Sequence, residues 1–305
     1  MDFLRPASWR DALEAKANHP DATPIAGGTD IMVEINFDHR RPATLLDMTG
    51  IDELANWSEH AGRLRIGAGL PYTRLINELG DRLPGLAIAA RTVGSPQIRN
   101  RGTLGGNLAS ASPAGDGHPP LLASGAEVEV ESVRGVRMLA MEEFFTGVKR
   151  HALAPDELIS AVHIAPATGA QQFSKIGTRN AMVIAVCTFA LSLHPEQQRV
   201  GTGLGSAAPT PRRAPEAEDF LSAELADSGQ WTSPRPLADS VVRHFGELVA
   251  RAASPIDDVR STAEYRTHAL SVMARRTLGW VWDEHRRQHS SNHPSNDHTG
   301  RSECA

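Results

Sequence analysis

The feature that most constrains this chain is a pair of glycine-containing segments that lie about eighty positions apart. The first comprises Ala26, Gly27, Gly28, Thr29 and Asp30, and the second comprises Thr103, Leu104, Gly105, Gly106 and Asn107. Adjacent glycines let the backbone approach an anion closely and point several N–H groups at it. Two such segments could hold one diphosphate from both sides, which predicts a dinucleotide bound between two subdomains.

Composition and charge narrow the class of protein. The 305 residues carry a formal net charge of −5, which argues against nucleic-acid binding driven by bulk charge. Cys187 and Cys304 form no C-x-x-C pair, so we expect neither a protein-bound iron–sulfur or zinc site nor a disulfide framework. The sequence shows no signal-peptide pattern and no apolar run long enough to span a bilayer, so we expect a cytoplasmic protein without membrane insertion.

The order of apolar and turn-forming residues predicts a mixture of helices and strands. We expect strands over 24–26, 44–48, 64–68, 126–131 and 158–164. We expect helices over 9–15, 73–79, 86–90, 237–252 and 262–282, the first capped by Ser8. A domain boundary is expected at 166–170. Residues after Glu284 have almost no apolar content, which predicts a disordered tail over 285–305.

The second glycine segment has the more specific surroundings. Arg99 and Arg101 precede it and bring cationic donors close to the expected phosphate. Small polar residues follow as far as Asp116, whose carboxylate could accept a hydrogen bond from a ribose hydroxyl or a flavin N–H. Asp116 could equally cap a helix beginning near Pro119, and the first segment could be an ordinary tight turn. Neither segment has the G-x-G-x-x-G or P-loop pattern, which argues against those nucleotide sites.

Together the two segments resemble the FAD-binding medium subunit of the molybdenum hydroxylases, the relatives of xanthine dehydrogenase, carbon monoxide dehydrogenase and the N-heterocycle hydroxylases. The resemblance lies in A-G-G-T-D at 26–30 and in I-R-N-R-G-T-L-G-G-N-L-A-S-A-S-P-A-G-D at 98–116. It continues at 173–181 and 205–214 and covers about residues 1–284. The second segment is its most specific part.

The resemblance implies an α+β fold. A two-subdomain FAD-binding domain of the PCMH type would occupy 1–168, with subdomains at about 1–57 and 58–168. A smaller α/β C-terminal domain would follow at 169–284, and the disordered tail would occupy 285–305.

The resemblance also implies roles for individual residues. Both glycine segments would bind the FAD diphosphate through backbone N–H groups. Asp116 would contact the cofactor, Leu158 would touch it through its backbone, and Lys175 would lie near the isoalloxazine. From the residues alone, Lys175 could instead be a solvated surface lysine, and His118 is better interpreted as a plain loop histidine than as a flavin-attachment or proton-transfer residue. No catalytic acid or base and no metal ligand is assigned to this chain.

The resemblance finally implies partners. A large subunit would carry a molybdenum–pterin centre, and a small subunit would carry two [2Fe–2S] clusters that pass electrons to this FAD. An external acceptor would reoxidise the flavin, and the complex would be a dimer of heterotrimers. Two other interpretations stay open: a self-contained PCMH-type flavoenzyme, either a reductase or an oxidase, without molybdenum partners, and a nucleotide-binding or scaffolding protein without a redox role.

Overall fold

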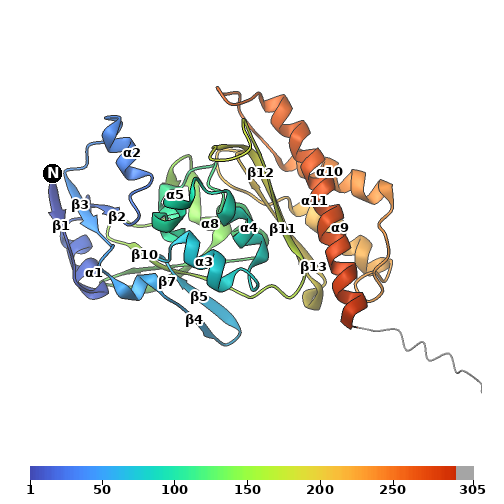
Figure 1. Ribbon diagram of the computed structural model, residues 1–305, viewed down its shortest axis with the longest axis horizontal. Helices are drawn as coiled ribbons and strands as arrows, with labels where there is room; N and C mark the ends of the chain where they lie inside the picture. The colour runs from blue at the N-terminus through green and yellow to red at the C-terminus, as the bar shows by residue number, and fades with distance from the viewer. Residues whose placement is uncertain (293–305) are drawn as a thin grey trace, which may run out of the picture.

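Three sheets of three or more strands follow one another along the long axis of the molecule in chain order (Figure 1). A fourth, two-stranded sheet pairs β8 (Phe145–Gly147) with β9 (Arg150–His151). The structure is a computed structural model that describes residues 1–292, and residues 293–305 lie outside the described part. The first sheet occupies one end, the largest sheet lies in the middle, and the third sheet with the C-terminal helices forms the other end. This mixture of segregated helices and largely antiparallel strands confirms the predicted α+β class.

The first sheet is small and parallel. Its strand order is β1 (Asp2–Leu4), β3 (Thr44–Asp47), β2 (Thr23–Ile25), and β3 runs parallel to both neighbours. Helix α1 (Trp9–Asn18) connects β1 to β2 and begins at Ser8, whose hydroxyl accepts from the Asp11 N–H at 3.1 Å. The first glycine segment leaves β2 and leads into the short helix α2 (Ile31–Asn36).

The central sheet is antiparallel and has five strands. Their order is β4 (Trp57–His60), β5 (Arg63–Gly67), β10 (Leu158–Ile164), β6 (Glu127–Ser132), β7 (Gly135–Ala140). Strand β6 shows why these residues form a half-buried strand, because Val128 and Val130 are fully buried while the alternating glutamates face the other side. The other elements of this half are η1 (Asp52–Ala55), α3 (Tyr72–Leu79), α4 (Pro84–Thr92), α5 (Pro96–Arg101), α6 (Leu104–Ser110), α7 (His118–Ala123), α8 (Met141–Phe144), β8 (Phe145–Gly147) and β9 (Arg150–His151).

The C-terminal part places three helices on an antiparallel sheet of order β11, β12, β13 (Figure 1). The strands are β11 (Gln171–Gly177), β12 (Ala185–His194) and β13 (Arg199–Gly205), with η2 (Pro195–Gln197) between the last two. The helices are α9 (Pro215–Asp227), α10 (Asp239–Ala252) and α11 (Ala263–Asn292). Every residue of β12 from Ala185 to Leu193 is buried, because one face meets these helices and the other meets α4 and α7.

The two parts have separate hydrophobic cores that meet at a close backbone contact. One core is built from residues before 165 and the other from residues after 169. A small cluster of Ala89, Ala123, Phe173 and Ala190 lies between them. A Cβ atom on Gly203 would lie 2.0 Å from the Pro119 carbonyl oxygen, so only glycine lets β13 pack directly on α7.

The prediction of a disordered tail was wrong for residues 285–292. These residues continue helix α11, which we expected to end near Trp282. The physical reason is packing: the His285 side chain is 6% exposed and its ring lies 5.1 Å from the Trp282 ring and 6.3 Å from the Trp231 ring, centroid to centroid. The rest of the predicted tail, 293–305, lies outside the described residues.

Candidate functional site

The two glycine segments lie against each other. A Cβ atom on Gly27 would lie 1.9 Å from the Arg101 carbonyl oxygen and 2.9 Å from the Gly102 nitrogen. Gly28 follows with a φ of +74°, a left-handed conformation that glycine adopts without strain. The first segment is therefore a turn that packs on the chain leading into the second segment, rather than a turn without a partner. The structure places the first segment against Arg101 and Gly102, the residues just before the second segment.

The second segment opens a helix, although no helix was among those expected from the sequence here. Helix α6 begins after Thr103, whose hydroxyl caps it by accepting from the Gly106 N–H at 3.0 Å. Gly105 lies where a Cβ would come within 2.5 Å of the Ala68 Cβ, so glycine lets α6 rest on the end of β5. The Gly105 N–H donates to the Ala68 carbonyl at 2.9 Å, which fixes the start of α6 against the central sheet.

Asp116 and Lys175 form a buried ion pair between the two parts of the chain. The Lys175 Nζ donates to the Asp116 Oδ2 at 2.6 Å, with the two side chains 11% and 7% exposed. The Thr92 hydroxyl donates to the same oxygen at 3.1 Å, and the Lys175 Nζ also reaches the Thr92 carbonyl at 3.4 Å. Burial raises the pKa of Asp116, and the neighbouring Lys175 opposes that shift.

These contacts decide two alternatives that the sequence left open. Asp116 does not cap the following helix, because α7 has Gly117 at its N-cap and no side-chain hydrogen bond there. Lys175 is not a solvated surface lysine, since its ammonium group is buried against Asp116 and Thr92. Thr92 is a member of this cluster that sequence reasoning missed, because a threonine at a helix end carries no distinctive pattern.

Several buried polar atoms near the second glycine segment have no hydrogen-bond partner within the described residues. They include the Tyr72 hydroxyl, the Asn107 Oδ1 and the Asp116 Oδ1. A Cβ atom on Gly117 would lie 2.9 Å from the Asn107 Oδ1 and 3.1 Å from the Tyr72 hydroxyl, so these two atoms converge on one glycine. Orphaned buried polar atoms are rare in native proteins. Together with the glycine contacts they are a donor and acceptor set that fits a polar, hydroxyl-rich ligand such as a dinucleotide.

Three other residues that the sequence associated with the site are a core residue, a residue that bonds to the backbone, and an exposed residue. Leu158 is 3% exposed and lies at the start of β10, in the same hydrophobic core as Leu104. Arg99 donates to the carbonyls of Val93 and Gly94 at 3.1 Å, so its guanidinium closes the end of α4. Arg101 is exposed.

His118 is a buried core residue and not a loop histidine. Its side chain is 0% exposed, its ring packs on Phe145 at 4.5 Å, and its Nε2 lies 3.1 Å from the Asn107 carbonyl oxygen. Burial lowers the pKa of His118 to about 4, so the ring is neutral at physiological pH and its Nε2 donates to that carbonyl. This arrangement gives His118 a packing role beside the site.

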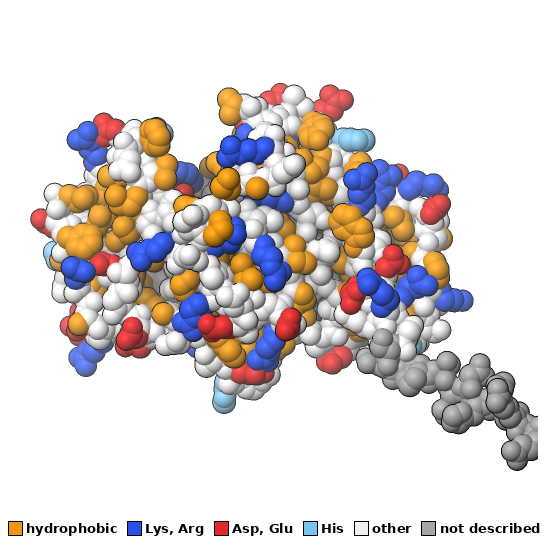
Figure 2. Space-filling model, in the orientation of Figure 1, with side chains coloured by type: hydrophobic (Ala, Val, Ile, Leu, Met, Phe, Trp, Pro, Cys, Tyr) orange, Lys and Arg blue, Asp and Glu red, His pale blue; other side chains and the backbone are white. Residues whose placement is uncertain are grey.

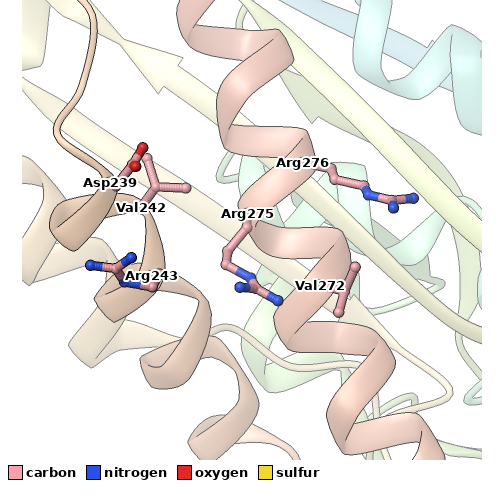
Figure 3. Close-up of a pocket in the computed structure, with 6 residues that line it drawn as sticks. All are labelled: Asp239, Val242, Arg243, Val272, Arg275 and Arg276. Atoms are coloured by element: carbon pink, nitrogen blue, oxygen red, sulfur yellow. The ribbon is translucent and has the colours of Figure 1, made fainter.

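The surface is hollowed next to these segments. Figure 2 shows a notch above α5, between the lobe that carries α2 and the lobe that carries the turn after β11. A second hollow, of about 430 Å³, lies between α10 and α11 and is lined by Arg243, Arg275 and Arg276. Those arginines point in different directions and do not converge on a common point (Figure 3). We therefore place the candidate site at the glycine segments.

Neither a metal-binding cluster nor a membrane-spanning helix is found among residues 1–292. No group of three or more His, Cys, Asp or Glu side chains is arranged to hold a metal ion. None of the helices described here is long and apolar enough to cross a membrane.

Comparison with known proteins defines the class and then the family. Residues 1–167 match the FAD binding domain in molybdopterin dehydrogenase, and residues 172–281 match the CO dehydrogenase flavoprotein C-terminal domain. Fold and site thus define an FAD-binding subunit of an oxidoreductase. The chain belongs to the family of FAD-binding medium subunits of xanthine and carbon monoxide dehydrogenases, which confirms the predicted family.

Individual relatives match over most of their length. The xanthine dehydrogenase FAD-binding subunit of Escherichia coli O157:H7 is 30% identical over 286 residues, covering 90% of this chain and 94% of that protein. The carbon monoxide dehydrogenase medium chain of Afipia carboxidovorans is 30% identical over 285 residues, covering 91% and 95%. A chain of carbon monoxide dehydrogenase from Hydrogenophaga pseudoflava superposes with a TM-score of 0.83 at 26% identity, covering 93% and 98%.

Proposed function

We propose that this chain holds FAD between its two glycine segments and relays electrons within a molybdenum hydroxylase. The electrons would come from [2Fe–2S] clusters on a small partner subunit, and substrate hydroxylation would take place at a molybdenum–pterin centre on a large one. An external acceptor would receive the electrons from this chain. The dimer of heterotrimers and the cytoplasmic location are parts of the same proposal.

The observation that carries the proposal is the contact between the first glycine segment and the residues that lead directly into the second. Gly27 brings its backbone against Arg101 and Gly102, immediately before the capped start of α6. The N–H groups of Gly105 and Gly106 already donate to Ala68 and Thr103, so the diphosphate would be bound by the N–H groups of the first segment and by those at the start of α6 that are not used in this way. On this proposal the diphosphate binds to residues 26–30 and 103–107.

The buried pair of Asp116 and Lys175 is assigned to the flavin end of the site. FAD supplies the redox chemistry when it is bound, and the protein supplies position and electrostatics. Lys175 would place a positive charge near the isoalloxazine, which favours the reduced flavin and so raises its reduction potential. Asp116 orients the lysine and would offer an acceptor to the cofactor, while Leu158 would make a backbone contact.

The proposal is tested by purifying the chain from its native host with whatever binds to it. We expect a complex that contains flavin, iron and molybdenum, with one FAD for each copy of this chain. Dithionite-reduced complex should return electrons to an added acceptor only when this chain carries flavin. A yellow chain that purifies alone and turns over a substrate unaided would instead support the self-contained flavoenzyme. A chain that stays colourless after FAD is added would contradict both.

A further inference from the structure

Ser206 has a backbone conformation that residues with a side chain rarely adopt. It follows β13 directly, its φ is +53°, and the residue is 6% exposed. A Cβ atom makes the left-handed region unfavourable, so a serine stays there only where its surroundings hold it. The Ser206 hydroxyl donates to the Ala185 carbonyl at 3.2 Å, which fixes the side chain. The carbonyl group of Ser206 is held separately, by an arginine.

That arginine is Arg266, which is buried near the start of α11. It is 3% exposed, and its Nη1 donates to the Ser206 carbonyl at 3.3 Å. Its Nη2 donates to the Asp258 Oδ1 at 2.5 Å, and Arg260 donates to the Asp258 Oδ2 at 2.6 Å. Asp258 therefore balances the buried charge of Arg266 and fixes the plane of its guanidinium. A guanidinium fixed in this way directs its second hydrogen bond at one carbonyl.

Ser206 in turn holds the segment that leads to Asp116. Its N–H donates to the Pro113 carbonyl at 2.7 Å, a bond from the C-terminal part to the FAD-binding part three residues before Asp116. The Gly115 N–H donates to the Ser112 carbonyl at 3.0 Å, so Pro113 lies within the turn that ends beside Asp116. The φ angle is the rotation between the N–H and the rest of the residue. The left-handed φ of Ser206 therefore lets its N–H reach Pro113 while its carbonyl stays on the guanidinium.

We propose that Arg266 is a positioning residue for Asp116. Its guanidinium holds Ser206 in the left-handed conformation, and Ser206 then fixes the Pro113 carbonyl. The short turn after Pro113 sets where the Asp116 carboxylate meets Lys175. Arg266 acts through Ser206 and not by contact with the cofactor. Because the inference gives Asp116 a place at the flavin, it rests on the proposed function.

The first measurement needs no cofactor. In the flavin-free chain, hydrogen exchange of the Ser206 N–H is followed by NMR, because this N–H donates to the Pro113 carbonyl from the left-handed conformation. Arg266→Met removes the guanidinium and should make that exchange about tenfold faster. An unchanged exchange rate in a folded Arg266→Met chain would overturn the inference.

The second measurement is FAD affinity in the whole chain, with flavin removed and FAD titrated back while its fluorescence is followed. Arg266→Met should raise the Kd for FAD about tenfold, the effect of one lost hydrogen bond to a charged group, and should change the visible circular dichroism of the bound flavin. Adding Ser206→Gly should restore the circular dichroism and bring Kd within about twofold of the wild type, because glycine adopts the left-handed conformation without support. A loss of stability alone would not be reversed by deleting a second side chain.

Arg213→Met is the matched control. Arg213 also joins the two parts of the chain, but it does so through Glu142 and Glu218. Its loss should lower the stability of the chain and leave both Kd and the flavin circular dichroism unchanged. Arg266→Lys replaces Arg266→Met if the latter folds poorly. A lysine keeps the charge but lacks the planar fork that holds two acceptors, so Kd should again rise and Ser206→Gly should again reverse the rise.

Three results would overturn the inference: an unchanged Kd in both Arg266 variants, a rise in Kd that Ser206→Gly does not reverse, or an equal rise in Arg213→Met. A wild-type chain that binds no FAD would overturn the proposed function instead. The exchange measurement would then still report whether Arg266 holds Ser206.

Discussion

At the scale of single residues, the ion pair of Asp116 and Lys175 is the contact with the largest consequences. The two residues are 59 positions apart, come from different parts of the chain and have side chains that are only 7% and 11% exposed. A pair of this kind contributes little net stability while it is intact, but removing one partner leaves an uncompensated charge in a low-dielectric environment. The pair therefore connects the geometry of the proposed cofactor site to the stability of the whole chain.

Replacing the lysine tests that connection. Lys175→Met should lower the free energy of unfolding by about 3–5 kcal/mol, because Asp116 is left buried without its cation. The double variant Lys175→Met with Asp116→Asn should recover most of the loss. Urea unfolding followed by circular dichroism measures both. The exposed pair of Arg10 and Glu14 supplies the control, and Arg10→Met should cost less than about 0.5 kcal/mol. Equal losses in Lys175→Met and Arg10→Met would contradict this account.

His118 predicts a dependence of stability on pH. Its pKa is about 4 in the folded chain, against 6.5 for an unperturbed histidine, so the unfolded chain binds the extra proton between pH 6.5 and 4. Stability should fall as the pH falls through this window, by about 3 kcal/mol in total from this residue. His118→Gln keeps a donor to the Asn107 carbonyl and removes the titration. Urea unfolding at several pH values should show a shallower acid slope in this variant, and identical slopes would contradict the prediction.

At the scale of elements, packing and capping stabilise helical segments that the local sequence pattern does not predict. Helix α6 contains Gly105, Gly106 and Asn107, which favour turns over helices. It forms because Thr103 caps it and because both glycines permit close contacts with their surroundings. The end of α11 is similar, since residues 285–292 are polar in sequence and are held by His285 packing on two tryptophans.

Truncation tests the end of α11. A chain that stops after Glu284 should be less stable than one that stops after Asn292, by roughly 1–3 kcal/mol, because it loses the buried His285 ring and the last two turns of helix. The midpoint of thermal unfolding compares the two. Equal midpoints would mean that residues 285–292 contribute nothing to the fold, as the sequence composition alone indicated.

At the scale of the whole molecule, the sequence predicts the parts better than their contacts. The paired glycine segments, the strand over 158–164 and the family are all readable from short patterns. The ion pair of Asp116 and Lys175, the role of Thr92 and the buried hydroxyl of Tyr72 are not, because each depends on elements that meet only after the chain folds. A lone tyrosine after Pro71 or a threonine at a helix end has no period or spacing to identify it.

The central claim is that one FAD is held where the two glycine segments meet, and FAD binding by Gly27→Ala tests it most directly. The added methyl group would lie 1.9 Å from the Arg101 carbonyl oxygen, so the segments must separate. Gly246→Ala is the matched control, because its methyl would lie 2.7 Å from the Arg275 Cγ, between the C-terminal helices. Each chain, freed of flavin, is titrated with FAD and its bound flavin is counted by absorbance. We predict one FAD per chain for the wild type and for Gly246→Ala, and weak or no binding for Gly27→Ala. A folded Gly27→Ala chain that binds one FAD as tightly as the wild type would contradict the account.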